Sequence, residues 1–165
     1  IRMLNMPSTA AARARTPDRI EKSIELRAPV SRVWRALTDH NEFGAWSRVQ
    51  LDEPFKVGEE SHGQILYPGY EHLTWRAVIQ QIDPEQFFAF TWHPYAVDPK
   101  VDYSEETPTL VEFGLEPTDS GTRLTLTESG FSDLPDERRE EAFRRNDDGW
   151  TQQMKNLEEY LAKNA

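Results

Sequence analysis

Apolar and polar residues alternate over several short segments, which is the pattern of strands that bury one face of a sheet. The segment 109–116 places Val111, Phe113 and Leu115 on one face. After the turn at 118–121, the segment 122–129 places Leu124 and Leu126 inward. The two segments therefore form a predicted hairpin. Further strands are predicted at 20–26, 64–67, 72–82 and 86–92, and the last two form a second hairpin across Pro84 and Glu85.

Three segments instead repeat their apolar residues at helical spacing. Pro29 opens a first helix whose apolar face is Val30, Val33, Trp34 and Leu37, and a second short helix is predicted at 41–46 with Phe43 and Trp46 inward. A long helix at 136–162 carries the stripe Phe143, Asn146, Trp150, Met154, Leu157 and Leu161. A strand, two short helices, a run of antiparallel strands and a long C-terminal helix together predict an α+β domain.

The 165-residue length fits one domain, which we place at 20–165 after a flexible N-terminal tail at 1–19. The chain has 29 acidic and 19 basic residues, a net charge of -10, which argues against binding to nucleic acids or anionic membranes. No apolar run reaches the roughly 20 residues of a membrane helix. The absence of cysteine excludes disulfides, thiolate metal sites and a cysteine nucleophile, and it fits a cytoplasmic location.

Glu128 is the most informative polar residue of the sequence. It continues the inward face of Leu124 and Leu126, and a buried carboxylate is costly unless it is paired or hydrated. Two interpretations stay open: Glu128 accepts hydrogen bonds at the end of its strand, or it is a polar anchor inside a ligand cavity. Asn146 on the long helix raises the same alternative, because it interrupts an apolar stripe.

Aromatic residues are numerous enough to line a pocket between the sheet and the long helix, although each taken singly also fits an ordinary core. The candidate ligand-binding residues are Trp75, Phe88, Phe90, Trp92, Phe113, Glu128, Asn146, Trp150 and Met154. Gly149 breaks the helix propensity beside Trp150, for which a close sheet contact or a kink is the expected reason. The Pro94–Pro108 loop is a candidate gate.

No nucleophile motif, P-loop or dinucleotide-binding motif occurs, and the four histidines lack the spacing of metal ligands. The sequence thus predicts no metal and no cofactor. Glu128 is the only candidate catalytic residue, as a general base.

Several motifs resemble the START-like (SRPBCC) superfamily, in the branch related to the activator of the heat-shock protein 90 ATPase. The motifs are the segment from Ala28 to Asp39 with Phe43 and Trp46, then 82–85, 90–92, 121–126, 128–131, Gly149-Trp150 and 154–161. The resemblance covers about 20–161 and implies a helix-grip fold, a curved antiparallel sheet wrapped around the C-terminal helix with a cavity between them. The stretch 57–63 departs from the family's usual Gly-Gly and aromatic strand, so no substrate is carried over.

The leading hypothesis is a binding protein for a small hydrophobic or aromatic ligand, without catalysis. One alternative is a cavity enzyme, such as a cyclase or hydrolase, that uses Glu128 as acid or base. The other is an interaction protein that contacts the chaperone, which the resemblance implies. A homodimer is compatible with the exposed sheet edges.

Overall fold

The computed structural model describes residues 16–165. Its elements are, in chain order, β1 (Arg19–Leu26), α2 (Val30–Thr38), α3 (His40–Ser47), β2 (Val49–Leu51), β3 (Glu60–Ile65), β4 (Thr74–Asp83), β5 (Phe87–Trp92), β6 (Thr109–Pro117), β7 (Thr122–Ser129), a 3-10 turn η2 (Phe131–Asp133) and α4 (Asp136–Lys163). The predicted α+β order is confirmed, including the two short helices after the first strand.

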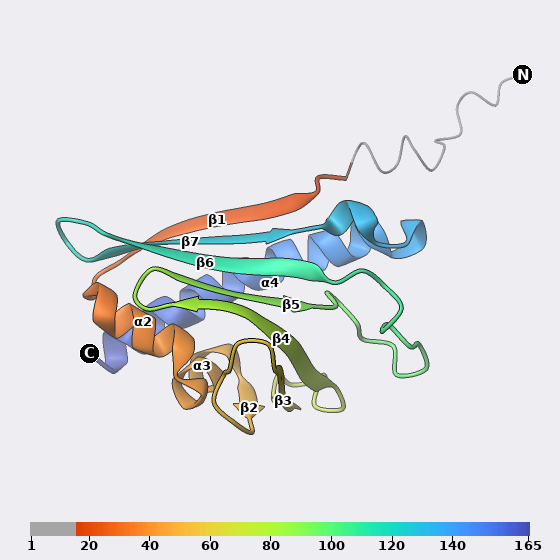
Figure 1. Cartoon of the computed structure of the whole chain (residues 1–165), viewed down its shortest axis with the longest axis horizontal. Helices are drawn as coiled ribbons and strands as arrows, with labels where there is room; N and C mark the ends of the chain where they lie inside the picture. Colours follow the sequence, from red (N-terminus) through yellow and green to blue (C-terminus); the bar gives the residue numbers. More distant parts are fainter. Residues whose placement is uncertain (1–15) are drawn as a thin grey trace, which may run out of the picture.

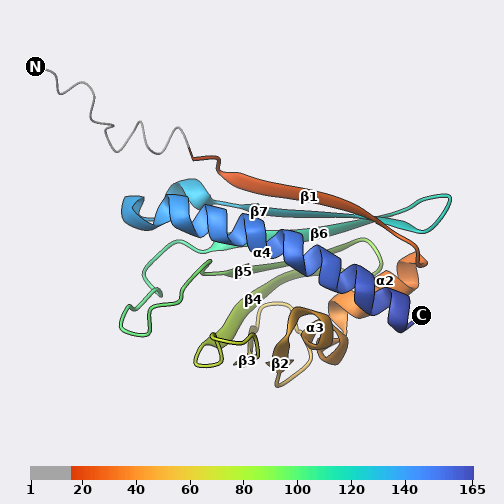
Figure 2. The ribbon, with the colours of Figure 1, turned by 180° about the vertical axis from the view of Figure 1, so that it is seen from behind.

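The strands form one antiparallel sheet in the order β1-β7-β6-β5-β4-β3-β2. The sheet is curved, and α4 runs along its inner face (Figures 1 and 2). A bulge between Ile79 and Gln81 shifts the register of β4 against β5, and bulges of this kind bend a strand and increase its twist. This is the predicted helix-grip arrangement.

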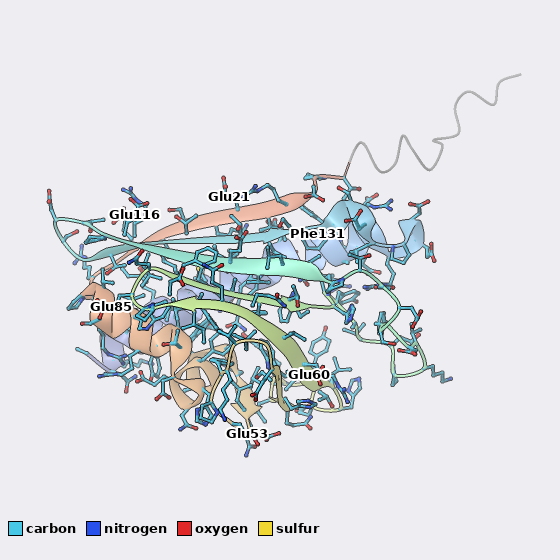
Figure 3. The ribbon with its side chains drawn as sticks, in the orientation of Figure 1. Glu21, Glu53, Glu60, Glu85, Glu116 and Phe131 are labelled. Carbon is cyan, nitrogen blue, oxygen red and sulfur yellow. The ribbon has the colours of Figure 1, made fainter. Side chains whose placement is uncertain are left out.

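The core lies between the inner sheet face and the helices. Phe88, Phe90, Val111, Phe113, Leu124 and Leu126 are fully buried from the sheet, and Trp150, Met154, Leu157 and Leu161 are buried from α4. The acidic residues lie mainly outside it. Figure 3 shows Glu21, Glu85 and Glu116 on the outside of the strands and turns.

β2 was not predicted, and β3 begins at Glu60 rather than at residue 64. β2 has only three residues, too few for a period of two to stand out. Its position depends on Gly44 in α3, where a Cβ atom would collide with the Val49 carbonyl. Gly44 therefore lets β2 pack directly against the helix that precedes it.

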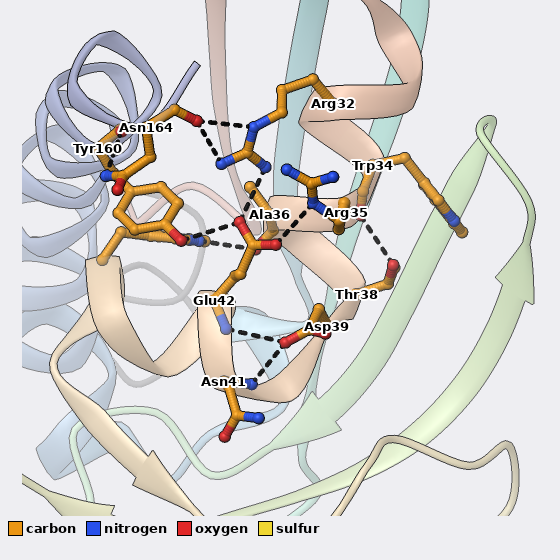
Figure 4. A network of polar contacts seen from close by, with 11 residues as sticks. Arg32, Trp34, Arg35, Ala36, Thr38, Asp39, Asn41, Glu42, Tyr160 and Asn164 are labelled. Atoms are coloured by element: carbon orange, nitrogen blue, oxygen red, sulfur yellow. Dashed lines mark hydrogen bonds and ion pairs between the residues drawn. The ribbon is translucent and has the colours of Figure 1, made fainter.

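A polar network fixes α2 and α3 to the C-terminal end of α4 (Figure 4). Glu42 Oε1 lies 2.8 Å from Arg32 and accepts a hydrogen bond from the Tyr160 hydroxyl, also at 2.8 Å, and Glu42 Oε2 accepts one from Arg35. Arg32 also donates to the Asn164 carbonyl at the end of α4.

The predicted tail at 1–19 falls for the most part outside the described residues. Within the described residues, Asp18 attaches the start of the domain to η2. Its carboxylate accepts hydrogen bonds from the Ser132 amide and hydroxyl. These hydrogen bonds lower the pKa of Asp18, and the one from the Ser132 hydroxyl has the largest effect. β1 then begins at Arg19.

Candidate functional site

Glu128 is completely buried at the end of β7, on the inner face of the sheet. Its partner across the β6–β7 ladder is Val111, and its partner in β1 is Ile20. The alternation along β7 that turns Leu124 and Leu126 inward therefore turns Glu128 inward as well.

Four side chains donate hydrogen bonds to the Glu128 carboxylate. Trp92 Nε1 and the Thr109 hydroxyl donate to Oε2 at 2.8 and 2.6 Å. Trp150 Nε1 and Asn146 Nδ2 donate to Oε1 at 2.8 and 2.9 Å. Trp92 and Thr109 are register partners in β5 and β6, whereas Asn146 and Trp150 are one turn apart on α4. The carboxylate thus joins three strands to the long helix.

The donor set matches an ionised carboxylate, which only accepts hydrogen bonds. An indole N–H can only donate, so Trp92 and Trp150 each need an acceptor inside the protein. Glu128 supplies both acceptors and holds the two rings 5.8 Å apart between centroids. The effect of Glu128 is to fix the orientation of two tryptophan rings.

A partly open cavity of about 300 Å³ lies beside these rings, between α3, the β2–β4 side of the sheet and the middle of α4. Its aromatic lining is Phe43, Trp46, Tyr67, Trp75, Trp92 and Trp150. The remaining lining residues are Ser47, Val49, Ile65, Asn146, Gly149, Gln152 and Gln153. No charged side chain belongs to this lining.

The predicted site residues divide into three groups. Trp75, Trp92, Asn146 and Trp150 line the cavity. Phe88, Phe90, Phe113 and Met154 are buried in the core around it and are not part of the lining. Glu128 lies behind the wall, in contact with three lining residues, and does not itself reach the cavity.

No pattern in the sequence pointed to Tyr67, which follows β3 and lines one side of the cavity. Its hydroxyl accepts a hydrogen bond from Asn156 of α4 at 2.8 Å, and Arg48 lies over its ring at 5.3 Å. Asn156 also donates to Gln153, whose amide donates to the Ser47 carbonyl. This chain of contacts joins the β3–β4 loop, α4 and the end of α3 around the cavity.

Gly149 has a different role from the one expected. A Cβ atom at this position would meet nothing within 4 Å, so no close sheet contact requires the glycine. The residue lies at the cavity lining, within a helix that continues to Lys163. Its missing side chain leaves space at that wall.

The Pro94–Pro108 loop is tied to α4 and contributes nothing to the cavity lining. Arg138 donates to both Glu106 carboxylate oxygens, at 3.0 and 2.7 Å, and to the carbonyls of Pro94 and Tyr95. It also lies 4.7 Å from the Tyr103 ring centroid. Arg138 therefore contacts both ends of the loop.

Within residues 16–165, no group of three or more His, Asp or Glu side chains is arranged to hold a metal ion. In the same part of the chain, no helix combines the length and the apolarity needed to span a membrane.

The comparisons with known proteins agree with this architecture. The family model for "Activator of Hsp90 ATPase homolog 1-like protein" matches residues 27–162. No curated protein matches the chain. Among solved structures, protein MLL2253 from Mesorhizobium loti is 26% identical, with a TM-score of 0.70 over 89% of this chain and 98% of its own.

Two more distant structures share the fold. The Aha1 dimer from Colwellia psychrerythraea is 17% identical, with a TM-score of 0.64 over 87% of this chain and 95% of its own. DynU16, from the dynemicin biosynthetic locus, is 20% identical, with a TM-score of 0.69 over 88% of this chain and 48% of its own. At these identities the likeness concerns the fold alone.

Proposed function

The chain belongs to the family of proteins like the activator of the Hsp90 ATPase, and from this premise we propose that it binds a small, largely apolar or aromatic ligand in the cavity between the sheet and α4. The proposal needs no catalytic step. It concerns the cavity itself, because the family fold by itself hosts several functions.

The observation that carries the proposal is the pair of tryptophans held by Glu128. Trp92 and Trp150 line the cavity, and both of their N–H groups are fixed to one buried carboxylate. Fixed aromatic side chains offer a large contact area at little cost in conformational entropy on binding. A core that needed only to be filled would not require a buried carboxylate, which is costly to desolvate.

The cavity volume limits the size of the ligand. A cavity of about 150 Å³ holds a single benzene ring, and this cavity measures about 300 Å³. A molecule of two fused rings, such as a naphthalene derivative, is therefore the suitable probe.

Gly149 offers a variant that blocks the cavity without disturbing the fold. Because the space around its Cβ position is empty, Gly149→Phe should place a ring in the cavity, and Gly149→Ala is the matched control. Both substitutions improve helix propensity, so neither should lower stability. Native mass spectrometry of the purified full chain, with and without 2-naphthylmethanol, gives the readout.

We expect the wild type and Gly149→Ala to gain the mass of one probe molecule and Gly149→Phe to gain none. Equal binding by all three proteins would mean that the probe sits elsewhere. No binding by the wild type across a set of one- and two-ring probes would reject the proposal.

Contact with the chaperone is a separate hypothesis that comes from the family description alone. Stimulation of the purified chaperone ATPase by the full chain would support it, and no stimulation at a large molar excess would reject it.

A further inference from the structure

The hydrogen-bonding groups around the cavity are unequally available to a ligand. The four indole nitrogens of the lining all donate within the protein: Trp46 to the Ala36 carbonyl, Trp75 to the Ser61 hydroxyl, and Trp92 and Trp150 to Glu128. The amide nitrogens of Asn146, Gln152 and Gln153 also have protein acceptors. Among the side-chain donors of the lining, the Tyr67 hydroxyl has no acceptor in the described residues, and the amides of Gln152 and Gln153 each keep a second N–H without one.

An acceptor is available on α4, beside Glu128. Asn146 directs its Nδ2 toward both Glu128 oxygens, at 2.9 and 3.2 Å. Reversing the amide would place its oxygen against a carboxylate, so Glu128 fixes the orientation. Asn146 Oδ1 has no donor within the described part of the chain, which leaves it free to accept from a ligand.

The buried charge beside the cavity is negative, whereas Arg48, which lies over the Tyr67 ring, is exposed to solvent. In residues 16–165, Glu128 is completely buried and its partners are all neutral donors, with no Lys, Arg or His among them. This carboxylate lies directly behind Trp92, Asn146 and Trp150. The cavity lining holds no basic residue, and the whole chain carries a net charge of -10. The field in the cavity therefore favours positive charge.

We infer that the ligand carries a positively charged or strongly hydrogen-bond-donating end, such as an ammonium group, on a one- or two-ring apolar body. The cation would lie against the tryptophan rings, which attract cations through their π electrons, and would donate to Asn146 Oδ1. An anion would instead be repelled by the Glu128 carboxylate behind the wall, whose hydrogen-bond donors are all neutral. This inference rests on the proposed function, because it describes the ligand of the same cavity.

Four probes of one size test the inference by isothermal titration calorimetry at neutral pH: 2-naphthylmethylammonium, 2-naphthylmethanol, 2-methylnaphthalene and 2-naphthoate. We expect the ammonium to bind about 3- to 30-fold more tightly than the alcohol, which is the range of a cation–π contact. The alcohol should exceed the hydrocarbon, and the carboxylate should bind most weakly.

The two hypotheses fail differently. Equal affinities for the four probes, or tighter binding of the carboxylate, would overturn the inference and leave the proposed function standing. No binding of any probe would remove both.

Gln152 supplies an independent test because it is exposed on α4 and lines the rim of the cavity. Gln152→Glu should tighten ammonium binding and Gln152→Lys should weaken it, each by about two- to fivefold, as expected for a partly solvated charge. The neutral alcohol is the control for altered shape, and the quantity compared is the ratio of the ammonium affinity to the alcohol affinity. Parallel changes in the affinities of both probes would overturn the electrostatic assignment.

Discussion

Glu128 shows how one buried residue determines the shape of a site that it does not line. Its two oxygens accept hydrogen bonds from four side chains of β5, β6 and α4, so the carboxylate has little capacity left for a reaction. A general base needs a free oxygen within hydrogen-bond reach of its substrate. The contacts of Glu128 therefore fit a positioning role for Trp92 and Trp150 better than an acid–base role.

Replacing Glu128 should damage folding first. In Glu128→Gln one oxygen becomes an NH₂ group and faces donors, so at least one buried N–H or O–H loses its acceptor. We expect a loss of about 2–4 kcal/mol in the free energy of unfolding, measured by urea denaturation.

Glu112→Gln is the matched control, because Glu112 lies on the neighbouring strand β6 and accepts a weak hydrogen bond from Thr127 at 3.3 Å, which an amide oxygen can also accept. It should cost less than about 0.5 kcal/mol. Equal stability of Glu128→Gln and the wild type would contradict the account of the carboxylate.

The sequence allowed some of these residues to be predicted and not others. Strand alternation indicates that Glu128 points inward, and helical spacing does the same for Asn146 and Trp150. Periodicity does not tell whether the space they face is filled, so Phe90 and Trp92 looked equivalent. They differ because Phe90 is covered on all sides, whereas Trp92 lies at the strand end beside the cavity.

At the scale of elements, α2 and α3 are held against α4 by ion pairs and hydrogen bonds at Glu42. Partial burial acts to raise the pKa of this carboxyl, but the hydrogen bonds from Tyr160 and Arg32 outweigh it and lower the pKa. Burial, followed by the hydrogen bond to Glu42, raises the pKa of Tyr160. The two shifts together favour the pair of carboxylate and neutral phenol.

The lowered pKa of Glu42 gives a pH dependence of defined sign. A group whose pKa falls on folding stabilises the protein above its ordinary pKa, and this contribution is lost as the pH falls through the folded value. Glu42→Gln should therefore lose less stability than the wild type between about pH 7 and about pH 3. The measurement is the urea midpoint at the two pH values.

Asp18 also has a lowered pKa, but it is present in both the wild type and Glu42→Gln. The difference between the pH dependences of the two proteins therefore isolates the contribution of Glu42. A pH dependence identical to that of the wild type would show that the network contributes nothing to acid sensitivity.

Arg138 gives a prediction for the Pro94–Pro108 loop. Arg138→Met removes the pair with Glu106 and both carbonyl contacts, so loop amides should exchange hydrogen faster, as in other weakly held segments. Ligand affinity should stay within about twofold, because the loop does not line the cavity.

Arg145→Met is the control, since Arg145 contacts the same loop only through the Tyr95 ring at 5.4 Å. A large affinity loss in Arg138→Met alone would restore the interpretation of this loop as a gate.

The elements themselves were predictable where they are long. The two hairpins and the long helix were predicted within a few residues, because ten or more positions repeat one period. β2 and the start of β3 were not, since their positions depend on contacts with α3 and β4 that no local pattern contains.

For the molecule as a whole, the cavity exists because α4 packs closely on one part of the curved sheet and less closely on another. α4 packs against the inner face with Leu157 and Leu161 fully or nearly fully buried, whereas Gly149 and Gln152 are exposed where the helix passes the β2–β4 side. The tryptophans gather at that side, where sheet, α3 and α4 meet.

The most direct test of ligand binding in the cavity uses the five indole N–H signals of the protein in a ¹H–¹⁵N NMR titration. Four of the five tryptophans line the cavity, and Trp34 on α2 does not, so it serves as an internal reference. With 2-naphthylmethylammonium as the probe, we expect the signals of Trp46, Trp75, Trp92 and Trp150 to shift with a single affinity while that of Trp34 stays in place. Shifts confined to Trp34, or no shifts at saturating probe, would contradict the account.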